Sequence, residues 1–301
     1  MLTFPDPNVE TEYTDPNGSV WEFNGTGWVR QCDCPDGGDG GDPEPTDPYW
    51  NNTNLLINAD GLPDGSQEIV DVTGKNNPLV VNAPAASTEQ FKYGDASVRF
   101  INSTGKGHIE VNKISYNNPF TFEAWVRRAK TFTSQRGTIF SHWHQSGASF
   151  IAWIGSGSSG NQGINLRISH SGSGIDFEQI GATQTVLDEW HHIAFCWDGN
   201  RYSLYVDGVR DIDYASTAKL YGSTTTPLAI GSARTTSSGD YQHYMDGWID
   251  DIRVTQGVCR YPVEFTPPDK APTKQTPSRA TVISVDSGDL FIGDNDVEDF
   301  K

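Results

Sequence analysis

The chain has 301 residues, with 21 Lys plus Arg against 39 Asp plus Glu, a formal net charge of −18. This balance excludes the basic surface that nucleic acids or anionic membranes require, and no apolar run reaches the roughly 18 residues of a transmembrane helix. The 31 Gly and 17 Pro argue against long helices, and 9 Trp, 11 Tyr and 14 Phe argue against disorder, so the composition predicts a folded, turn-rich β protein.

The first residues, MLTFPDPNVE, lack the basic, apolar and small-residue succession of a signal peptide. We therefore expect a chain made in a cytoplasm, with reduced thiols. Cys32 and Cys34 are one residue apart, Cys196 lies in an apolar run and Cys259 near the end. Cys-x-Cys supplies two of the four ligands of a structural zinc site, so linker thiols or contacts between copies are favoured over zinc.

Residues 1–31 contain a short hairpin pattern. Val20–Phe23 and Trp28–Arg30 are β-forming runs, and Asn24-Gly25 between them favours a tight turn. Two strands cannot bury three large aromatic side chains by themselves. We expect this module to pack on a partner or on copies of itself; the alternative is a decoration folded back onto the main domain.

Residues 32–48, CDCPDGGDGGDPEPTDP, are predicted to be a hinge, because Gly removes stiffness, Asp adds repulsion and Pro blocks strand pairing. Residues 49–272 then contain many short β-forming runs separated by turn signals such as Asp198-Gly199-Asn200. The predicted strands are Leu55–Ile57, Leu79–Val81, Ala96–Ile101, His108–Val111, Phe120–Val126, Gly137–Ser141, Ser149–Ile154, Ile164–Ile168, Ile175–Ile180, His192–Trp197, Tyr202–Val206, Leu228–Ile230 and Gly247–Val254. This spacing, without a helical period, predicts an all-β sandwich or barrel.

Residues 273–301 form a tail. Thr281–Val285 and Asp289–Gly293 predict one more hairpin, joined at Asp286-Ser287-Gly288. It is either an extra edge of the sandwich or a docking element.

Four stretches carry a resemblance to a known family. They are Phe120–Val126, Glu189–Gly208, Leu228–Gly231 and Gly247–Tyr261. They resemble the strands and central hairpin of laminin-G-like, concanavalin A-like domains. The continuation Phe265–Pro268 resembles a variant common in structural proteins of tailed bacteriophages.

This resemblance implies an all-β fold: a two-sheet concanavalin A-like jelly-roll sandwich, here with a small N-terminal β-hairpin module and a short C-terminal β tail. Asp15–Trp21 together with Gly27–Val29 also resembles small modules of phage fibre and appendage proteins. Within the jelly roll, Trp125 and Trp248 are expected to fill the core, because large aromatic residues on strands usually do so. On the strand His192–Trp197, alternation places Ile193 and Phe195 on one face and Ala194 and Cys196 on the other.

The resemblance also implies one structural Ca²⁺. The matching positions are Asp60 after the first strand and Asp251 on the last strand, with Gly94 as a carbonyl donor. Hard oxygen ligands from distant segments suit Ca²⁺. Asp250 and Asp251 point to opposite faces of a regular strand, so only one of them is expected to bind the ion; solvated edge carboxylates are the alternative.

The sequence evidence for catalysis is weaker than that for calcium binding. Some concanavalin A-like hydrolases place three acids at alternate positions of one strand, and Asp176 and Glu178 fit two of these positions. Gly174 occupies the position of the nucleophile, so a sugar-binding groove is expected at most. The pairs His142/His144 and His191/His192 lack a third metal ligand, and hydrogen-bonded strand-end histidines are the favoured interpretation.

Two tracts are candidates for ligand binding. Ser237–Tyr244 contains Tyr241, His243 and Tyr244, which can stack on sugar rings and bond hydroxyls. A second tract contains Trp143, His144 and Gln145. Ordinary surface loops are the alternative for both.

These observations predict a non-enzymatic structural protein of a phage virion, a tail or head fibre or decoration protein, that displays the jelly roll to host-surface glycans. Its N-terminal module would join other virion proteins, and a homo-oligomer would add avidity. We expect it on the virion surface after synthesis in the host cytoplasm, without nucleic acid or membrane insertion. The alternatives are a calcium-dependent carbohydrate-binding module outside a virion and a polysaccharide hydrolase.

Overall fold

The computed structural model describes residues 47–272, except 83, 103–106, 113, 134–135, 145–146, 156–159, 223–225 and 236–239, and five short strands outside this range. The chain divides into two compact units, residues 1–46 with 275–301 and residues 47–274. Each unit is described by itself. Within the described residues no helix is long and apolar enough to cross a membrane.

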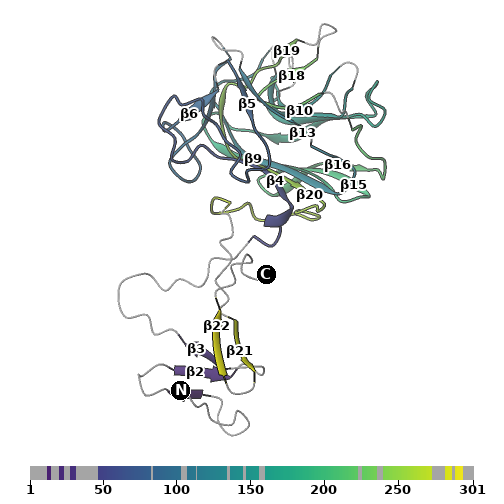
Figure 1. The fold of residues 1–301 in the computed structure, drawn as a ribbon. Helices are drawn as coiled ribbons and strands as arrows, with labels where there is room; N and C mark the ends of the chain where they lie inside the picture. Colours follow the sequence, from purple (N-terminus) through teal and green to yellow (C-terminus); the bar gives the residue numbers. More distant parts are fainter. Residues whose placement is uncertain are drawn as a thin grey trace. The chain divides into compact units, whose positions relative to one another are not determined.

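The first unit contains two small antiparallel sheets (Figure 1). Its strands are β1 (Glu12–Thr14), β2 (Val20–Phe23) and β3 (Trp28–Gln31) in one sheet, and β21 (Val282–Asp286) and β22 (Asp289–Gly293) in the other. Phe23 pairs with Trp28, so a connection of four residues, Asn24-Gly25-Thr26-Gly27, joins the two strands rather than a two-residue turn at Asn24-Gly25. That connection and the acidic hinge up to residue 46 lie outside the described residues.

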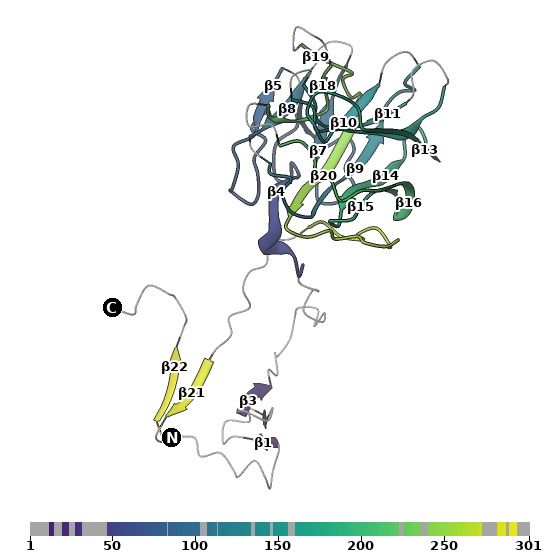
Figure 2. The ribbon, with the colours of Figure 1, turned by 90° about the vertical axis from the view of Figure 1, so that its right-hand side faces the viewer.

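The second unit is a sandwich of two sheets, seen from two directions in Figure 1 and Figure 2. The seven-stranded sheet has the order β13 (Phe177–Gln184), β12 (Gly163–Ile168), β11 (Phe150–Ile154), β10 (Gly137–His142), β17 (Leu228–Ile230), β8 (His108–Val111) and β5 (Leu79–Val81). The eight-stranded sheet has the order β16 (Val209–Ala215), β15 (Arg201–Val206), β14 (Trp190–Trp197), β9 (Phe120–Arg128), β20 (Gly247–Gln256), β7 (Ser97–Phe100) and β6 (Ala85–Ser87), with β4 (Thr53–Ile57) also paired to β20. The all-β jelly roll expected from the sequence is confirmed.

The core lies between the two sheets and is rich in aromatic rings. Phe122, Phe150 and Phe195 meet there, with ring centroids 4.9 and 5.1 Å apart for the pairs that Phe150 makes. On β14, Phe195 belongs to this core whereas Cys196 belongs to a cluster on the opposite face, as alternation predicts. Most strands of the eight-stranded sheet are buried on both faces.

Strand β20 changes its neighbour halfway along. Gly247–Ile249 pairs with β7, and Ile252–Thr255 pairs with β4. Between these segments the pairing with β9 slips, and Asp251 takes a left-handed backbone conformation with φ of 47°. The end of β4 and the start of β7 therefore arrive at the same bulge.

The two tryptophans expected in the core are buried, as predicted, but on the outer face of a sheet. Trp125 and Trp248 are buried, with 7% and 6% of their surface exposed, but neither belongs to the core between the sheets. Trp125 lies under the Nζ of Lys92, which is 3.9 Å from its ring centroid. Trp248 lies under Arg99, whose guanidinium carbon is 4.4 Å from the ring centroid. Both tryptophans thus pack on the outer face of the eight-stranded sheet beneath cationic side chains.

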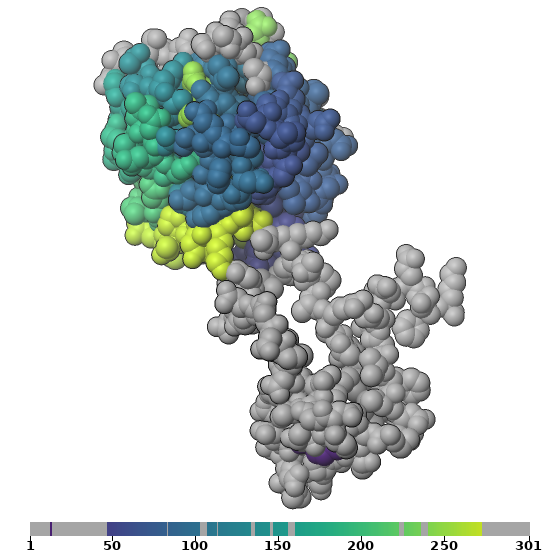
Figure 3. Space-filling view, turned by 90° about the vertical axis from the view of Figure 1, so that its left-hand side faces the viewer, coloured from purple at the N-terminus to yellow at the C-terminus, as the bar shows by residue number. Residues whose placement is uncertain are grey.

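Residues 257–272, which we call the C-terminal strap, cover part of that outer face. Figure 3 shows this segment in yellow along one side of the unit. The amide of Phe265 donates to the Gly208 carbonyl at 3.0 Å, and the Tyr93 hydroxyl donates to the Pro268 carbonyl at 2.7 Å. The stacked rings of Tyr261 and Phe265, with centroids 3.6 Å apart, close over the sheet. The strap explains why the strands beneath it are buried on both faces.

Candidate functional site

Two tryptophans and two arginines gather on the outer face of the seven-stranded sheet. Trp153 on β11 and Arg167 on β12 alternate with core residues and so face outward. The guanidinium carbon of Arg167 lies 5.4 Å from the ring centroids of both Trp143 and Trp153. That of Arg136 lies 4.8 Å from the Trp153 ring. We call these four residues together with His243 the tryptophan–arginine patch.

Positive charge exceeds negative charge in this patch. Arg167 is bound by Glu178 of the neighbouring strand through its Nε and Nη2 atoms, at 2.9 to 3.2 Å. Burial, and then the charge of Arg167, lowers the pKa of Arg136, whereas Glu178 raises it. Burial and the charges of both arginines lower the pKa of His243 to about 4, so its imidazole is neutral at pH 7. Two guanidinium groups therefore face one carboxylate.

A second group of rings lies on the same face of the sheet. The ring of Tyr241 stacks on His108, with centroids 3.7 Å apart, and its hydroxyl donates to Oε1 of Glu110 at 2.5 Å. The Tyr244 hydroxyl donates to the Tyr241 carbonyl at 2.7 Å. We call these four residues the tyrosine–histidine patch. Burial, and then Glu110, raises the pKa of Tyr241, so this side chain presents a fixed ring rather than an ionisable hydroxyl.

The strand order explains how the two patches share one surface. His108 and Glu110 lie on β8 and Arg167 lies on β12, with β17, β10 and β11 between them. The outward residues in this interval include Ala229 and Ser141, which are paired with each other across β17 and β10. Ser141, Ala229, Trp153 and His108 are buried, whereas Trp143, Arg167, Tyr241 and Tyr244 are partly exposed.

The structure brings four of the six predicted ligand-binding residues together in pairs, one pair in each patch. Trp143 and His243, from different tracts, both interact with Arg167. Tyr241 and Tyr244 belong to the tyrosine–histidine patch. His144 is half-buried directly after Trp143. Gln145 lies outside the described residues.

Arg136, Trp153 and Arg167 were missed by the sequence analysis. A signal for two of them was present, because Trp153 and Arg167 alternate with apolar residues along predicted strands. Alternation shows that such residues share a face, but it does not show whether that face is covered. On β20 Asp251 and Arg253 line a pocket together with residues of the C-terminal strap, whereas Trp143 and Arg167 remain partly exposed.

The predicted calcium ligands come together at the bulge of β20. Oδ1 of Asp60 accepts a hydrogen bond from the Asp95 amide at 3.0 Å, and a Cβ on Gly94 would lie 1.9 Å from that oxygen. Gly94 also has a positive φ of 68°, so a larger residue is excluded on two grounds. Burial and the charges of Asp250 and Asp60 raise the pKa of Asp251 to about 8, which places these carboxylates near one another.

The two adjacent acids on β20 have different surroundings. Asp250 is held by backbone amides: its Oδ2 accepts from Lys92 at 2.8 Å and its Oδ1 from Asp251 at 2.9 Å. Oδ2 of Asp251 is buried without a hydrogen-bond partner. The regular alternation assumed from the sequence is wrong here because of the bulge, and both side chains are buried.

This donor set fits a hard cation in part. A divalent ion near Asp251 Oδ2 would satisfy that oxygen and remove the repulsion between Asp60 and Asp251. In the described part of the chain no three His, Cys, Asp or Glu side chains form a group that could hold a metal. Calcium would therefore depend on these two carboxylates together with backbone carbonyls and water.

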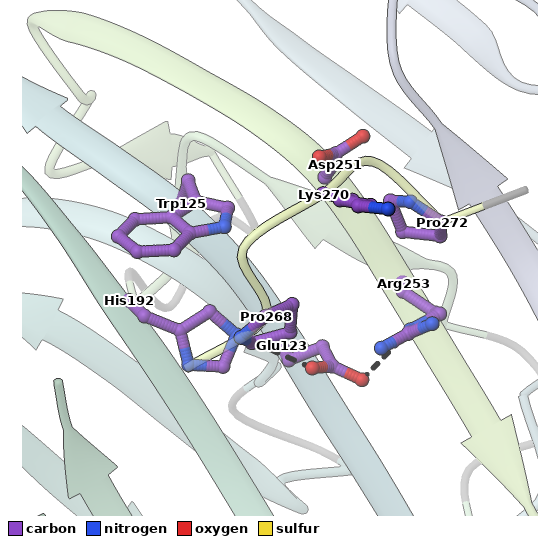
Figure 4. A pocket seen from close by; sticks show the side chains of 8 residues that line it. All are labelled: Glu123, Trp125, His192, Asp251, Arg253, Pro268, Lys270 and Pro272. Atoms are coloured by element: carbon purple, nitrogen blue, oxygen red, sulfur yellow. Dashed lines mark hydrogen bonds and ion pairs between the residues drawn. The ribbon is translucent and has the colours of Figure 1, made fainter. Parts of the chain in front are cut away.

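A small pocket lies beside the C-terminal strap (Figure 4). It has a volume of about 10 Å³ and is lined by Glu123, Trp125, His192, Asp251, Arg253, Pro268, Lys270 and Pro272. Glu123 accepts from Arg253 Nε at 2.8 Å and from the Tyr261 hydroxyl at 2.7 Å, and lies 3.2 Å from His192 Nε2. Burial would raise the pKa of Glu123, but Arg253 and His192 hold it well below its usual range. The pocket is smaller than typical ligand sites of about 300–1,000 Å³, and its charges neutralise one another.

The two acids considered for catalysis, Asp176 and Glu178, form other contacts. Asp176 precedes β13 rather than lying on it, and its Oδ2 accepts from the His170 amide at 2.7 Å. Glu178 is paired with Arg167 as described above. Among the histidines, His142 Nδ1 lies 2.5 Å from the Tyr116 hydroxyl, and His191 Nδ1 lies 2.7 Å from Oδ2 of Asp207. These are the hydrogen-bonded strand-end histidines that the sequence favoured.

Comparison with known proteins identifies the fold. The family model Laminin_G_3, described as the concanavalin A-like lectin/glucanases superfamily, matches residues 103–259, more than half of the chain. Domain 4 of AbnA, a GH43 extracellular arabinanase from Geobacillus stearothermophilus solved in complex with arabinotriose, is similar with a TM-score of 0.50 and 17% identity, over 69% of this chain and 93% of that chain. The binding domain of Paraclostridial Mosquitocidal Protein 1 is similar with a TM-score of 0.52 and 14% identity, over 69% of this chain but only 49% of that chain. No curated protein matches the chain.

Proposed function

The chain belongs to the concanavalin A-like lectin/glucanase superfamily, and we propose that it binds saccharides through the outer face of its seven-stranded sheet. The observation that carries this proposal is the convergence of Trp143, Tyr241 and His243 on one face. Saccharide sites combine ring surfaces with a few fixed polar groups, and both patches have this character. The similar arabinanase domain, which was solved with arabinotriose, supports the choice of ligand class.

The proposed binding is not catalytic. Glycoside hydrolysis needs a free acid and a second carboxylate on either side of the scissile bond. Asp176 instead caps a turn and Glu178 neutralises Arg167, so neither is placed for that chemistry. The position two residues before Asp176 is Gly174.

We place this activity on the surface of a tailed-phage virion. Support comes from the resemblance of Phe265–Pro268 to phage structural proteins and from the small N-terminal module with its acidic hinge. Several copies joined through their terminal segments would convert weak binding into avidity. Copurification of the chain with particles, as an oligomer, is the expected result; a monomer absent from particles would remove the virion role and leave saccharide binding intact.

A calcium-dependent binding module outside a virion is the second candidate. The observation that favours it is the buried, unpartnered Oδ2 of Asp251 close to Asp60. In such a module Asp60, Gly94 and Asp251 would hold the ion, which would fix the loops at the bulge. Retention of saccharide without any particle would favour this candidate.

Affinity electrophoresis of the full chain through gels containing arabinan, galactan or acidic polysaccharides tests the binding proposal. Trp143→Ala should weaken retention about tenfold, because stacking on one ring contributes on the order of 1.4 kcal/mol. Phe91→Ala is the matched control, since Phe91 is an aromatic side chain that is 41% exposed and belongs to neither patch. Equal retention of both variants would refute the proposed site.

A further inference from the structure

We propose that the tryptophan–arginine patch selects acidic saccharides, with Arg136 binding the carboxylate of the sugar. The inference rests on the proposed saccharide-binding function and specifies the class of its ligand. It follows from the different surroundings of the two arginines in the patch.

Arg167 is neutralised whereas Arg136 is not. Arg167 forms the two-point pair with Glu178. Among the described residues, Arg136 contacts the Trp153 ring and has electrostatic interactions with Arg167, Glu178 and His243. Glu178, the carboxylate that interacts with Arg136, is thus already bound by Arg167.

The residues between 47 and 272 that the structure does not describe are Ala, Ser, Thr, Gly, Gln and Lys, without any Asp or Glu. An excess of positive charge at this point is notable in a chain of net charge −18, since it opposes the overall repulsion of anions.

The geometry suits a carboxylate on a sugar ring. The guanidinium of Arg136 lies over the Trp153 ring, which leaves its edge available as a planar fork for two parallel hydrogen bonds. Arg136 is half-buried, so a bound anion is screened less than at an open surface. His243 is neutral at pH 7 and offers a donor or an acceptor to sugar hydroxyls.

Isothermal titration of the full chain with oligogalacturonate and with its methyl ester tests this selectivity. The two ligands have the same rings and differ at the carboxyl group, which is charged in the acid and neutral and methylated in the ester. The acid should bind at least tenfold more tightly than the ester at low salt. Arg136→Gln should abolish this preference, while Arg201→Gln, an exposed arginine of the eight-stranded sheet, should preserve it.

The outcomes separate the two proposals. Equal affinity for acid and ester, with both lost in Trp143→Ala, would overturn the acidic selectivity and leave saccharide binding standing. A preference for the acid that persists in Arg136→Gln would overturn the role of Arg136. No binding of either ligand by a chain that retains neutral arabinan would also overturn the selectivity, and binding of no saccharide at all would overturn the function itself.

A second inference concerns the C-terminal strap. The geometry points to Cys196 and Cys259 as a pair that forms a disulfide on oxidation and ties the strap to β14. Both cysteines are free, and Cys259 packs on the cluster that contains Cys196. The Thr121 hydroxyl contacts both segments. Its Oγ1 lies 3.5 Å from Cys196 Sγ and accepts a hydrogen bond from the amide of Arg260, the residue after Cys259, at 2.9 Å.

Cys259 is suited to initial exchange with oxidised glutathione, whereas burial raises the pKa of Cys196. Cys259 is half-buried, and its hydrogen bond with Cys196 lowers its pKa, so its thiolate attacks first and releases one glutathione thiolate. Cys196 then loses its proton, attacks the mixed disulfide and releases the second glutathione. The protein loses two electrons and two protons, and one oxidised glutathione becomes two reduced molecules.

Mass spectrometry of a Cys32→Ser/Cys34→Ser chain after treatment with oxidised glutathione tests this pair. The expected product has lost two hydrogens, yields a peptide that joins Cys196 to Cys259, and melts several degrees higher than the reduced form. Cys196→Ser should stop at the glutathione adduct of Cys259. A stable adduct on Cys259 in the chain that retains Cys196, or two unmodified thiols, would overturn the inference.

Discussion

Glu178 on β13 holds Arg167 on β12 through a two-point ion pair with nitrogen–oxygen distances of 2.9 to 3.2 Å. The same guanidinium lies over Trp143 and Trp153. One carboxylate therefore limits the positive charge of the patch and fixes the plane against which two rings pack.

Glu178→Gln should strengthen binding of oligogalacturonate. Removal of this carboxylate leaves two guanidinium charges for the ligand, so affinity should rise roughly three- to tenfold at low salt. The gain should shrink at about 0.5 M salt, where charges are screened. Isothermal titration measures both quantities. Unchanged affinity would show that the charge of the patch does not affect ligand binding. Measurable polysaccharide turnover that Glu178→Gln abolishes would instead establish a hydrolase.

A calcium ion at Asp60 and Asp251 should stabilise the fold. Calcium at about 100-fold above its Kd would contribute about 2.7 kcal/mol, which corresponds to a rise in Tm of about 5–10 °C for a domain of this size. A chelator should reverse this rise in the full chain. Asp251→Asn should abolish the calcium dependence, whereas Asp213→Asn, in an exposed pair with Arg201, should retain it. A wild-type Tm that is equal in calcium and in chelator would contradict the site.

The buried ion pairs of Glu123 should be important for stability. Glu123→Gln removes a charge that is 2% exposed and leaves Arg253 and His192 without it, so the free energy of unfolding should fall by about 3–5 kcal/mol. Asp213→Asn is the control and should cost less than about 0.5 kcal/mol. Urea unfolding at pH 7 measures both. A loss below about 1 kcal/mol for Glu123→Gln would contradict the network.

His142 should make the fold sensitive to acid. Burial lowers its pKa from 6.5 to about 4, so between these pH values the unfolded chain binds a proton that the folded chain does not. The stability contributed by the neutral imidazole is complete above about pH 6.5, and about 3 kcal/mol is lost by pH 4. Urea unfolding between pH 7 and pH 4 should show that the free energy of unfolding falls with pH. His142→Asn should remove the part of this fall that His142 contributes. An unchanged fall would assign the acid sensitivity to other groups.

The strands were largely predictable because their apolar periodicity is strong. The edge strand β16 (Val209–Ala215) was missed, since it is mostly exposed and carries charged residues that resemble a loop. The start of β13 was placed at Ile175, whereas the strand begins at Phe177, and this shift removed Asp176 from the supposed catalytic face.

The types of residue in the candidate sites were predictable from the sequence, but their neighbours in space were not. The tracts around Trp143 and Tyr241 were selected for their chemistry, yet only the sheet order shows that they share a face. The burial of Trp125 was predicted, but its place on the outer face was not, because the sequence does not show that the C-terminal strap lies beside it. The bulge at Asp251 likewise depends on two strands that meet β20 from one side, which no local pattern encodes.

Hydrogen–deuterium exchange of the full chain, with and without saturating saccharide, tests whether the saccharide binds to the outer face of the seven-stranded sheet. Protection confined to β8, residues 136–143, β11, β12 and residues 241–245 is the predicted result, because these segments carry the two patches. Protection confined to the C-terminal strap and β20, with the seven-stranded sheet unchanged, would contradict the account.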